Sequence, residues 1–139
     1  MSSTLTSSVN NNLKYVIILS VVALFFLFNS NNVLTKDNII VHVTVPSKEV
    51  ATKIARTLLN KKLAACVNVI PGILSFYTWK DKVNEDSELL LEIKTKTKLF
   101  DSLAKVVQTI HPYDVPEVIA ISMERASKSY AEWLEKNTI

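Results

Sequence analysis

The run from Lys62 to Trp79, KLAACVNVIPGILSFYTW, constrains the fold of this chain more than any other segment. Its alternating residues predict one strand that is longer than a small sheet needs to cover its own helices. The pair Pro71–Gly72 contains the only glycine of the chain and predicts a bend or bulge within that strand. We therefore expect the far end of the strand to reach beyond one subunit, into an oligomer.

Composition excludes several classes of function. The net charge is +3, and because basic and acidic residues are interleaved there is no dense basic stripe, so we predict no nucleic-acid partner. A single glycine is too few for the glycine-rich loops that cradle phosphate groups. A single cysteine excludes an intramolecular disulfide and every zinc site that needs several cysteines.

The N-terminal region differs in character from the rest of the chain. Residues 1–12 are rich in Ser, Thr and Asn and are predicted to be disordered. Residues 13–37 are predicted to be a hydrophobic leader and linker, and the apolar run Tyr15–Phe28 favours a signal anchor over a core helix. We expect a membrane-associated protein or one on a secretory or organellar route. The alternative is a soluble protein from which the leader has been removed. The sequence does not indicate whether the leader is cleaved.

Residues 38–139 are predicted to form one domain with the order β-α-β-β-α-β and a short C-terminal helix. Periodicity and capping residues place strands at 39–45, 62–79, 88–95 and 115–123, and helices after Ser47, Thr97 and Ser127. A polar turn is expected at Lys80–Asp86. This order is the split βαβ, ferredoxin-like arrangement of the α+β class, in which right-handed crossovers put both main helices on one face of an antiparallel sheet.

The other face of that sheet is expected to lack a cover within one subunit. Strand alternation puts Cys66 and Ile70 on this face, while Val67 and Val69 lie beneath the helices. An apolar face of this kind is covered most simply by further copies of the same chain.

Three motifs resemble the CutA family of divalent-cation-tolerance proteins. They lie at Ala64–Gly72, Tyr77–Trp79 and His111–Glu117, within a resemblance that runs from Asn38 to the C-terminus. The resemblance implies a homotrimer, similar to the nitrogen-regulatory PII proteins, in which the long hairpins form sheets across subunits. It also implies a role in metal tolerance, because bacterial members are linked to copper tolerance and bind divalent metal. Animal members with leaders are linked to processing or membrane anchoring of acetylcholinesterase, which makes a membrane-tethered trimeric scaffold with a protein partner the alternative.

Candidate metal ligands within these motifs are Cys66, His111 and Glu117. A thiolate and an imidazole suit copper or another divalent cation, and we expect weak binding and no other cofactor. The structural alternatives are that Cys66 is an inert small apolar residue and that His111 caps a helix. Copper-binding bacterial members carry a second cysteine and a second histidine where this chain has Val43 and Ile110.

A second group of candidates is aromatic. Tyr77, Trp79 and Tyr113 are predicted to line an inter-subunit pocket, with Lys94 and Glu117 as its polar groups. The alternative is that they serve, like Ile70, only to pack the interface between subunits.

Catalysis is not expected. A nucleophilic Cys66–His111 pair would need an orienting third group and an environment that activates the thiol. A cysteine in the middle of a strand has no helix N-terminus to do so. We therefore predict that the protein is not an enzyme.

Overall fold

The computed structural model describes residues 32–35 and 37–139. The predictions for residues 1–12 and for Tyr15–Phe28 lie outside these residues, as does most of the leader on which a membrane-tethered scaffold depends. Among the described residues, no helix combines the length and the apolar character needed to cross a membrane. Leu34–Ile139 form one compact unit.

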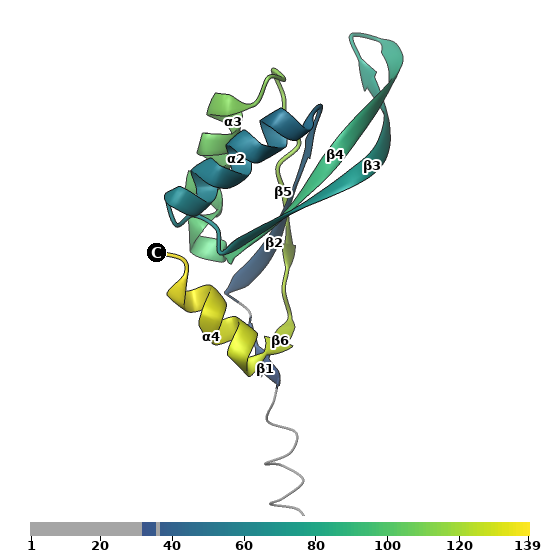
Figure 1. Cartoon of the computed structure of the whole chain (residues 1–139). Helices are drawn as coiled ribbons and strands as arrows, with labels where there is room; N and C mark the ends of the chain where they lie inside the picture. Colours follow the sequence, from purple (N-terminus) through teal and green to yellow (C-terminus); the bar gives the residue numbers. More distant parts are fainter. Residues whose placement is uncertain (1–31, 36) are drawn as a thin grey trace, which may run out of the picture. The chain divides into compact units, whose positions relative to one another are not determined.

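Four strands form one antiparallel sheet in the order β3-β4-β2-β5. They are β2 (Asn38–Val45), β3 (Cys66–Trp79), β4 (Lys82–Lys96) and β5 (Ile119–Ser122). Two helices, α2 (Lys48–Asn60) and α3 (Phe100–Ile110), lie together on one face of the sheet (Figure 1). The remaining elements are β1 (Asn32–Leu34), η2 (Thr97–Leu99), β6 (Arg125–Ser127) and α4 (Lys128–Lys136). The predicted ferredoxin-like order and the additional C-terminal helix are confirmed.

The core lies between the sheet and its two helices. Alternate residues of β2 (Val41, Val43 and Val45) are fully buried, because one side of a strand faces the helices. The helices complete this layer with apolar residues at helical spacing, which are Ala51, Ile54, Leu58, Leu103 and Val107.

The long strand begins at Cys66 rather than at Lys62. Lys62 has a φ of 54°, and its N–H bonds to the Leu59 carbonyl while the N–H of Leu63 bonds to the Leu58 carbonyl. This pattern closes the C-terminus of α2 in a Schellman motif, which keeps the residues around Lys62 out of the strand. The prediction that the strand starts at Lys62 was therefore wrong, because it did not include this capping motif.

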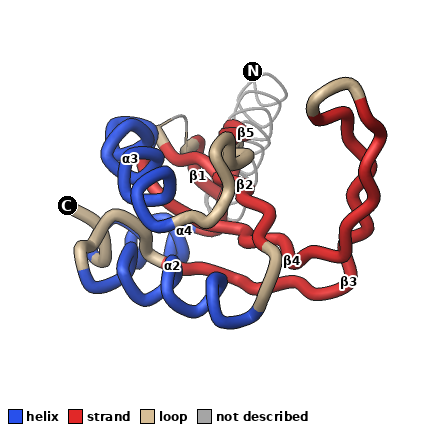
Figure 2. The backbone as a smooth tube through the Cα atoms, turned by 90° about the horizontal axis from the view of Figure 1, so that it is seen from above, coloured by secondary structure: helices blue, strands red, loops and turns tan. Residues whose placement is uncertain are grey.

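The β3–β4 hairpin projects beyond the helices, and its second strand is longer than predicted (Figure 2). The bulge is confirmed, because the register shifts between Pro71 and Ile73 and Gly72 has a φ of 84°. The prediction of a seven-residue turn at Lys80–Asp86 was wrong. Lys80 and Asp81 have φ values of 50° and 63°, as a two-residue type I′ turn requires, so β4 starts at Lys82.

Two further boundaries differ from the prediction. Thr97 does not cap a helix with its side chain; it starts the 3-10 turn η2, and its N–H donates to the Asp37 carbonyl at 2.7 Å. The fourth strand of the sheet, β5, starts at Ile119 rather than at Val115, because residues 115–118 contain Pro116, which lacks the N–H that a sheet needs.

The face of the sheet opposite the helices carries exposed apolar side chains. Ile70, Ile119 and Ile121 are 38%, 48% and 47% exposed. The registers of β3, β4, β2 and β5 put all three on the face that also carries Cys66. We call this surface the open face.

Candidate functional site

The residues predicted to act together lie in two separate places. Cys66 and Lys94 are cross-strand neighbours where the β3–β4 ladder begins. Tyr77, Trp79 and Tyr113 line a cleft towards the other end of the hairpin. Lys94 is therefore not a polar group of the aromatic cleft within one chain.

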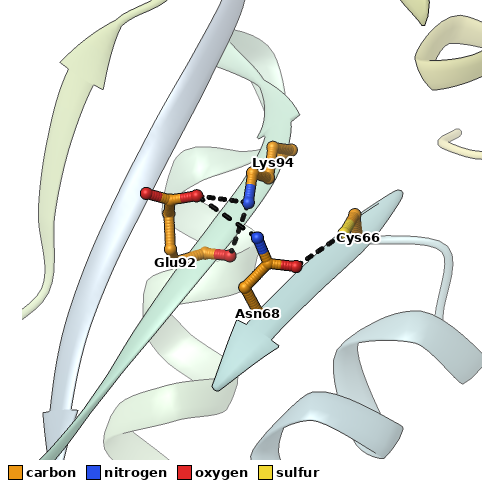
Figure 3. A network of polar contacts seen from close by, with 4 residues as sticks. All are labelled: Cys66, Asn68, Glu92 and Lys94. Atoms are coloured by element: carbon orange, nitrogen blue, oxygen red, sulfur yellow. Dashed lines mark hydrogen bonds and ion pairs between the residues drawn. The ribbon is translucent and has the colours of Figure 1, made fainter. Parts of the chain in front are cut away.

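Cys66 belongs to a polar cluster with Asn68, Glu92 and Lys94 on the open face (Figure 3). The Cys66 thiol donates to Asn68 Oδ1 at 3.4 Å, and the Asn68 amide donates to Glu92 Oε1 at 3.4 Å. The Lys94 ammonium forms an ion pair with the same Glu92 oxygen. The hydrogen bond from Lys94 lowers the pKa of Glu92, against the opposing effect of burial. A soft sulfur donor and an ionised carboxylate thus lie within one ladder.

His111 uses both of its ring nitrogens within the fold. Its Nε2 lies 2.9 Å from the Thr44 carbonyl, and its Nδ1 accepts the backbone N–H of Tyr113 at 3.1 Å. Because a carbonyl only accepts and a backbone N–H only donates, this network assigns the neutral tautomer with the proton on Nε2. His111 is 8% exposed, and its ring meets that of Tyr113 edge-on at 4.8 Å. The residue therefore ties the end of α3 to β2.

The three sequence-predicted metal ligands do not meet within one chain. Cys66 pairs with Lys94, whereas Thr44, the partner of His111, pairs with Leu90. Leu90 and Lys94 are four positions apart, which corresponds to on the order of 13 Å along a strand. In the described part of the chain, no group of three or more His, Cys, Asp and Glu side chains is placed to hold a metal ion.

The aromatic residues line a cleft of about 610 Å³ between the β3–β4 hairpin and residues 112–117. Its hairpin wall includes Phe76, Tyr77, Trp79 and Glu88, and its other wall includes Tyr113 and Glu117. His111 fixes the start of this second wall through its bond to Tyr113. The structure therefore brings together four of the predicted residues, Tyr77, Trp79, Tyr113 and Glu117, within a single chain.

Two tyrosine–carboxylate pairs lie at this cleft. Tyr77 donates its hydroxyl to Asp86 Oδ2 at 2.6 Å, and Tyr113 donates to Glu88 Oε1 at 3.1 Å. The bulge explains the first pair, because it moves Tyr77 onto the strand side that carries Asp86. The hydrogen bond to Asp86 raises the pKa of Tyr77. The pKa of Tyr113 is raised to about 12, mainly by burial and secondly by the hydrogen bond to Glu88.

The raised pKa of Tyr113 predicts a loss of stability at alkaline pH. The neutral phenol is favoured in the folded state, so its stabilising contribution is complete below pH 10.0, the ordinary pKa, and is lost as the pH rises towards 12. We expect Tyr113→Phe to remove the last phenolate step from the near-ultraviolet absorbance titration and to reduce the loss of stability over that range. An unchanged last step in this variant would assign the step to another tyrosine.

Three residues of these two places, Asn68, Glu92 and Glu88, were not predicted to be site residues. Asn68 and Glu92 follow from Cys66 by strand pairing, so a correct register would have identified them. Strand alternation turns Glu88 away from the core, yet it is 6% exposed because Tyr113 and the second wall cover it. No local sequence signal indicates a cover that comes from a segment so distant along the chain.

Comparison with known proteins gives one family. Residues 39–137 match the family model described as "CutA1 divalent ion tolerance protein". The chain is 48% identical over 99 residues to the divalent-cation tolerance protein CutA of Thermus thermophilus, covering 71% of this chain and 96% of that protein. It is 48% identical over 104 residues to the chloroplastic protein CutA 1 of Oryza sativa, covering 75% of this chain and 59% of that protein.

Solved structures agree with these relatives. The CutA1 structure from Thermus thermophilus matches with a TM-score of 0.71 and 46% identity, over 73% of this chain and 99% of that chain. The CutA1 structure from Oryza sativa matches with a TM-score of 0.72 and 48% identity, over 74% of this chain and 94% of that chain. The match to the human protein CutA covers 54% of that protein, so the chain spans little more than half the length of some relatives.

Proposed function

This chain belongs to the CutA1 divalent ion tolerance family, and we propose that it contributes to metal tolerance as a homotrimer that binds a copper-type divalent cation. The observation that carries the binding role is the pairing of a partly exposed thiol, Cys66, with the ionised carboxylate of Glu92 through Asn68. Sulfur donors suit copper and zinc, and the carboxylate supplies a harder oxygen.

The proposed trimer rests on the open face and on the hairpin. Ile70, Ile119 and Ile121 leave apolar surface uncovered in one subunit, and Val83, which does not line the cleft, is 78% exposed on a hairpin that projects past the helices. Further copies of the chain would bury this surface. Assembly also gives donors from different copies, such as Glu117, access to a shared ion.

Lys94 is central to a test of the metal site, because its ammonium neutralises the carboxylate that the ion needs. We expect Lys94→Gln to raise the affinity for Cu²⁺ and Zn²⁺ about tenfold, since it removes a competing positive charge. Cys66→Ser and Glu92→Gln are each expected to lower the affinity by at least about tenfold. Calorimetric titration of the full chain measures all three.

The matched control is Glu135→Gln, which neutralises another carboxylate that pairs with a lysine, Lys96 at 2.7 Å. This variant should bind metal like the wild type. Equal affinities in wild type, Cys66→Ser and Lys94→Gln would refute a metal site at this cluster. A loss in Glu117→Gln as large as that in Cys66→Ser would indicate an ion that is shared between copies.

A further inference from the structure

We infer that the cleft between the β3–β4 hairpin and residues 112–117 binds a small organic cation that donates N–H hydrogen bonds, such as an alkylammonium or guanidinium ion. This site is separate from the Cys66 cluster and takes a different class of ligand. Three features of the cleft favour such a ligand, which are its charge, its aromatic wall and the hydrogen-bonding state of its acids.

The charge of the cleft is negative. Glu88, Asp114 and Glu117 line it, and none of the described lining residues is basic. Glu88 is the informative one, because it is 6% exposed and takes part in neither of the ion pairs formed among the described residues. A carboxylate that is buried without a positive partner is costly, and a cation in the cleft would remove that cost.

The aromatic wall suits a cation with a carbon skeleton rather than a bare metal ion. Tyr77 and Trp79 are each 41% exposed and line the cleft, so their rings offer negative faces and apolar area. Trp79 already has an ammonium nearby, since Lys80 Nζ lies 6.0 Å from its ring centroid. A volume of about 610 Å³ holds a molecule of several heavy atoms.

The two tyrosines determine which groups remain free to bind. Tyr77 and Tyr113 donate their hydroxyls to Asp86 and Glu88, and each carboxylate keeps further lone pairs. Both phenols are protonated at neutral pH, as a tyrosine with the ordinary pKa of 10.0 is, and their raised pKa values extend this state to higher pH. The cleft therefore offers acceptor oxygens to a ligand with charged N–H groups. Hydrogen bonds between charged groups are stronger than those between neutral groups. Quaternary ammonium ions have no N–H group and cannot form them.

The test uses the fluorescence of Trp79 in the full chain. The chain has two tryptophans, and Trp133→Phe leaves Trp79 as the only one. We expect 1,4-diaminobutane and agmatine to change this fluorescence saturably, while 1,4-butanediol and tetramethylammonium do not. Glu88→Gln, which retains an acceptor for Tyr113, and Glu117→Gln should each weaken binding of the amines about tenfold.

Glu85→Gln is the matched control. It removes one charge from an exposed position of β4, the strand that carries Glu88, but outside the cleft. It should leave amine binding unchanged. The inference is overturned if neither amine binds, if Glu85→Gln weakens binding as much as Glu117→Gln, or if tetramethylammonium binds as tightly as the amines. Because Cys66 lies outside the cleft, Cys66→Ser should not affect this assay even if it abolishes binding of metal.

Discussion

Replacing Ile70 with aspartate is expected to convert the assembled protein into monomers. Ile70 lies on the open face, is 38% exposed in one subunit and would be buried by a second copy. A carboxylate without a positive partner costs several kcal/mol to desolvate, and a trimer contains three copies of it. Light scattering of wild type and Ile70→Asp at the same concentration measures the change in mass.

The control for Ile70→Asp is Leu59→Asp. Leu59 is also a large apolar residue and is 41% exposed, but it lies on α2, in the layer opposite the open face. A trimer that persists in Leu59→Asp and dissociates in Ile70→Asp assigns the interface to the open face. A wild-type protein with the mass of a monomer would refute the homotrimer, and dissociation in both variants would refute this choice of face.

The parts of the fold that sequence predicted are those set by local chemistry. Ser47 illustrates this, because its side chain accepts the Val50 N–H and starts α2 where a capping serine was expected. The bulge at Pro71–Gly72 was predicted for the same reason, since a proline and a lone glycine interrupt a strand. The I′ turn at Lys80–Asp81 was missed, because neither residue is the glycine or asparagine that usually accepts a positive φ.

The site was less predictable because it depends on long-range pairing. The structure brings the predicted aromatic residues to one cleft, but strand alternation without the bulge does not put Tyr77 beside Asp86. Cys66 and His111 both carry chemistry suited to a metal, and only the register shows that they lie apart. Which side chains of one strand meet a distant loop is decided by tertiary packing rather than by local preference.

His111 shows how a residue with ligand chemistry can instead have a structural role. We expect His111→Ala to lower the free energy of unfolding by about 2–4 kcal/mol, because it leaves the partly buried carbonyl of Thr44 and the N–H of Tyr113 without partners. His111→Gln should lose less, since its amide supplies one donor and one acceptor. Urea unfolding measures the loss, at one protomer concentration because the stability of an oligomer depends on concentration.

The chain has one other histidine, His42, which provides the comparison. It is half-buried on the open face and its removal deletes no bond between α3 and β2, so His42→Ala should lower the free energy of unfolding by less than His111→Ala does. If His111→Ala unfolds like the wild type and yet loses affinity for Cu²⁺, His111 is a ligand. If it is destabilised while the folded fraction binds Cu²⁺ as before, His111 positions Tyr113 and the second wall of the cleft, and the cation depends on Cys66 and Glu92.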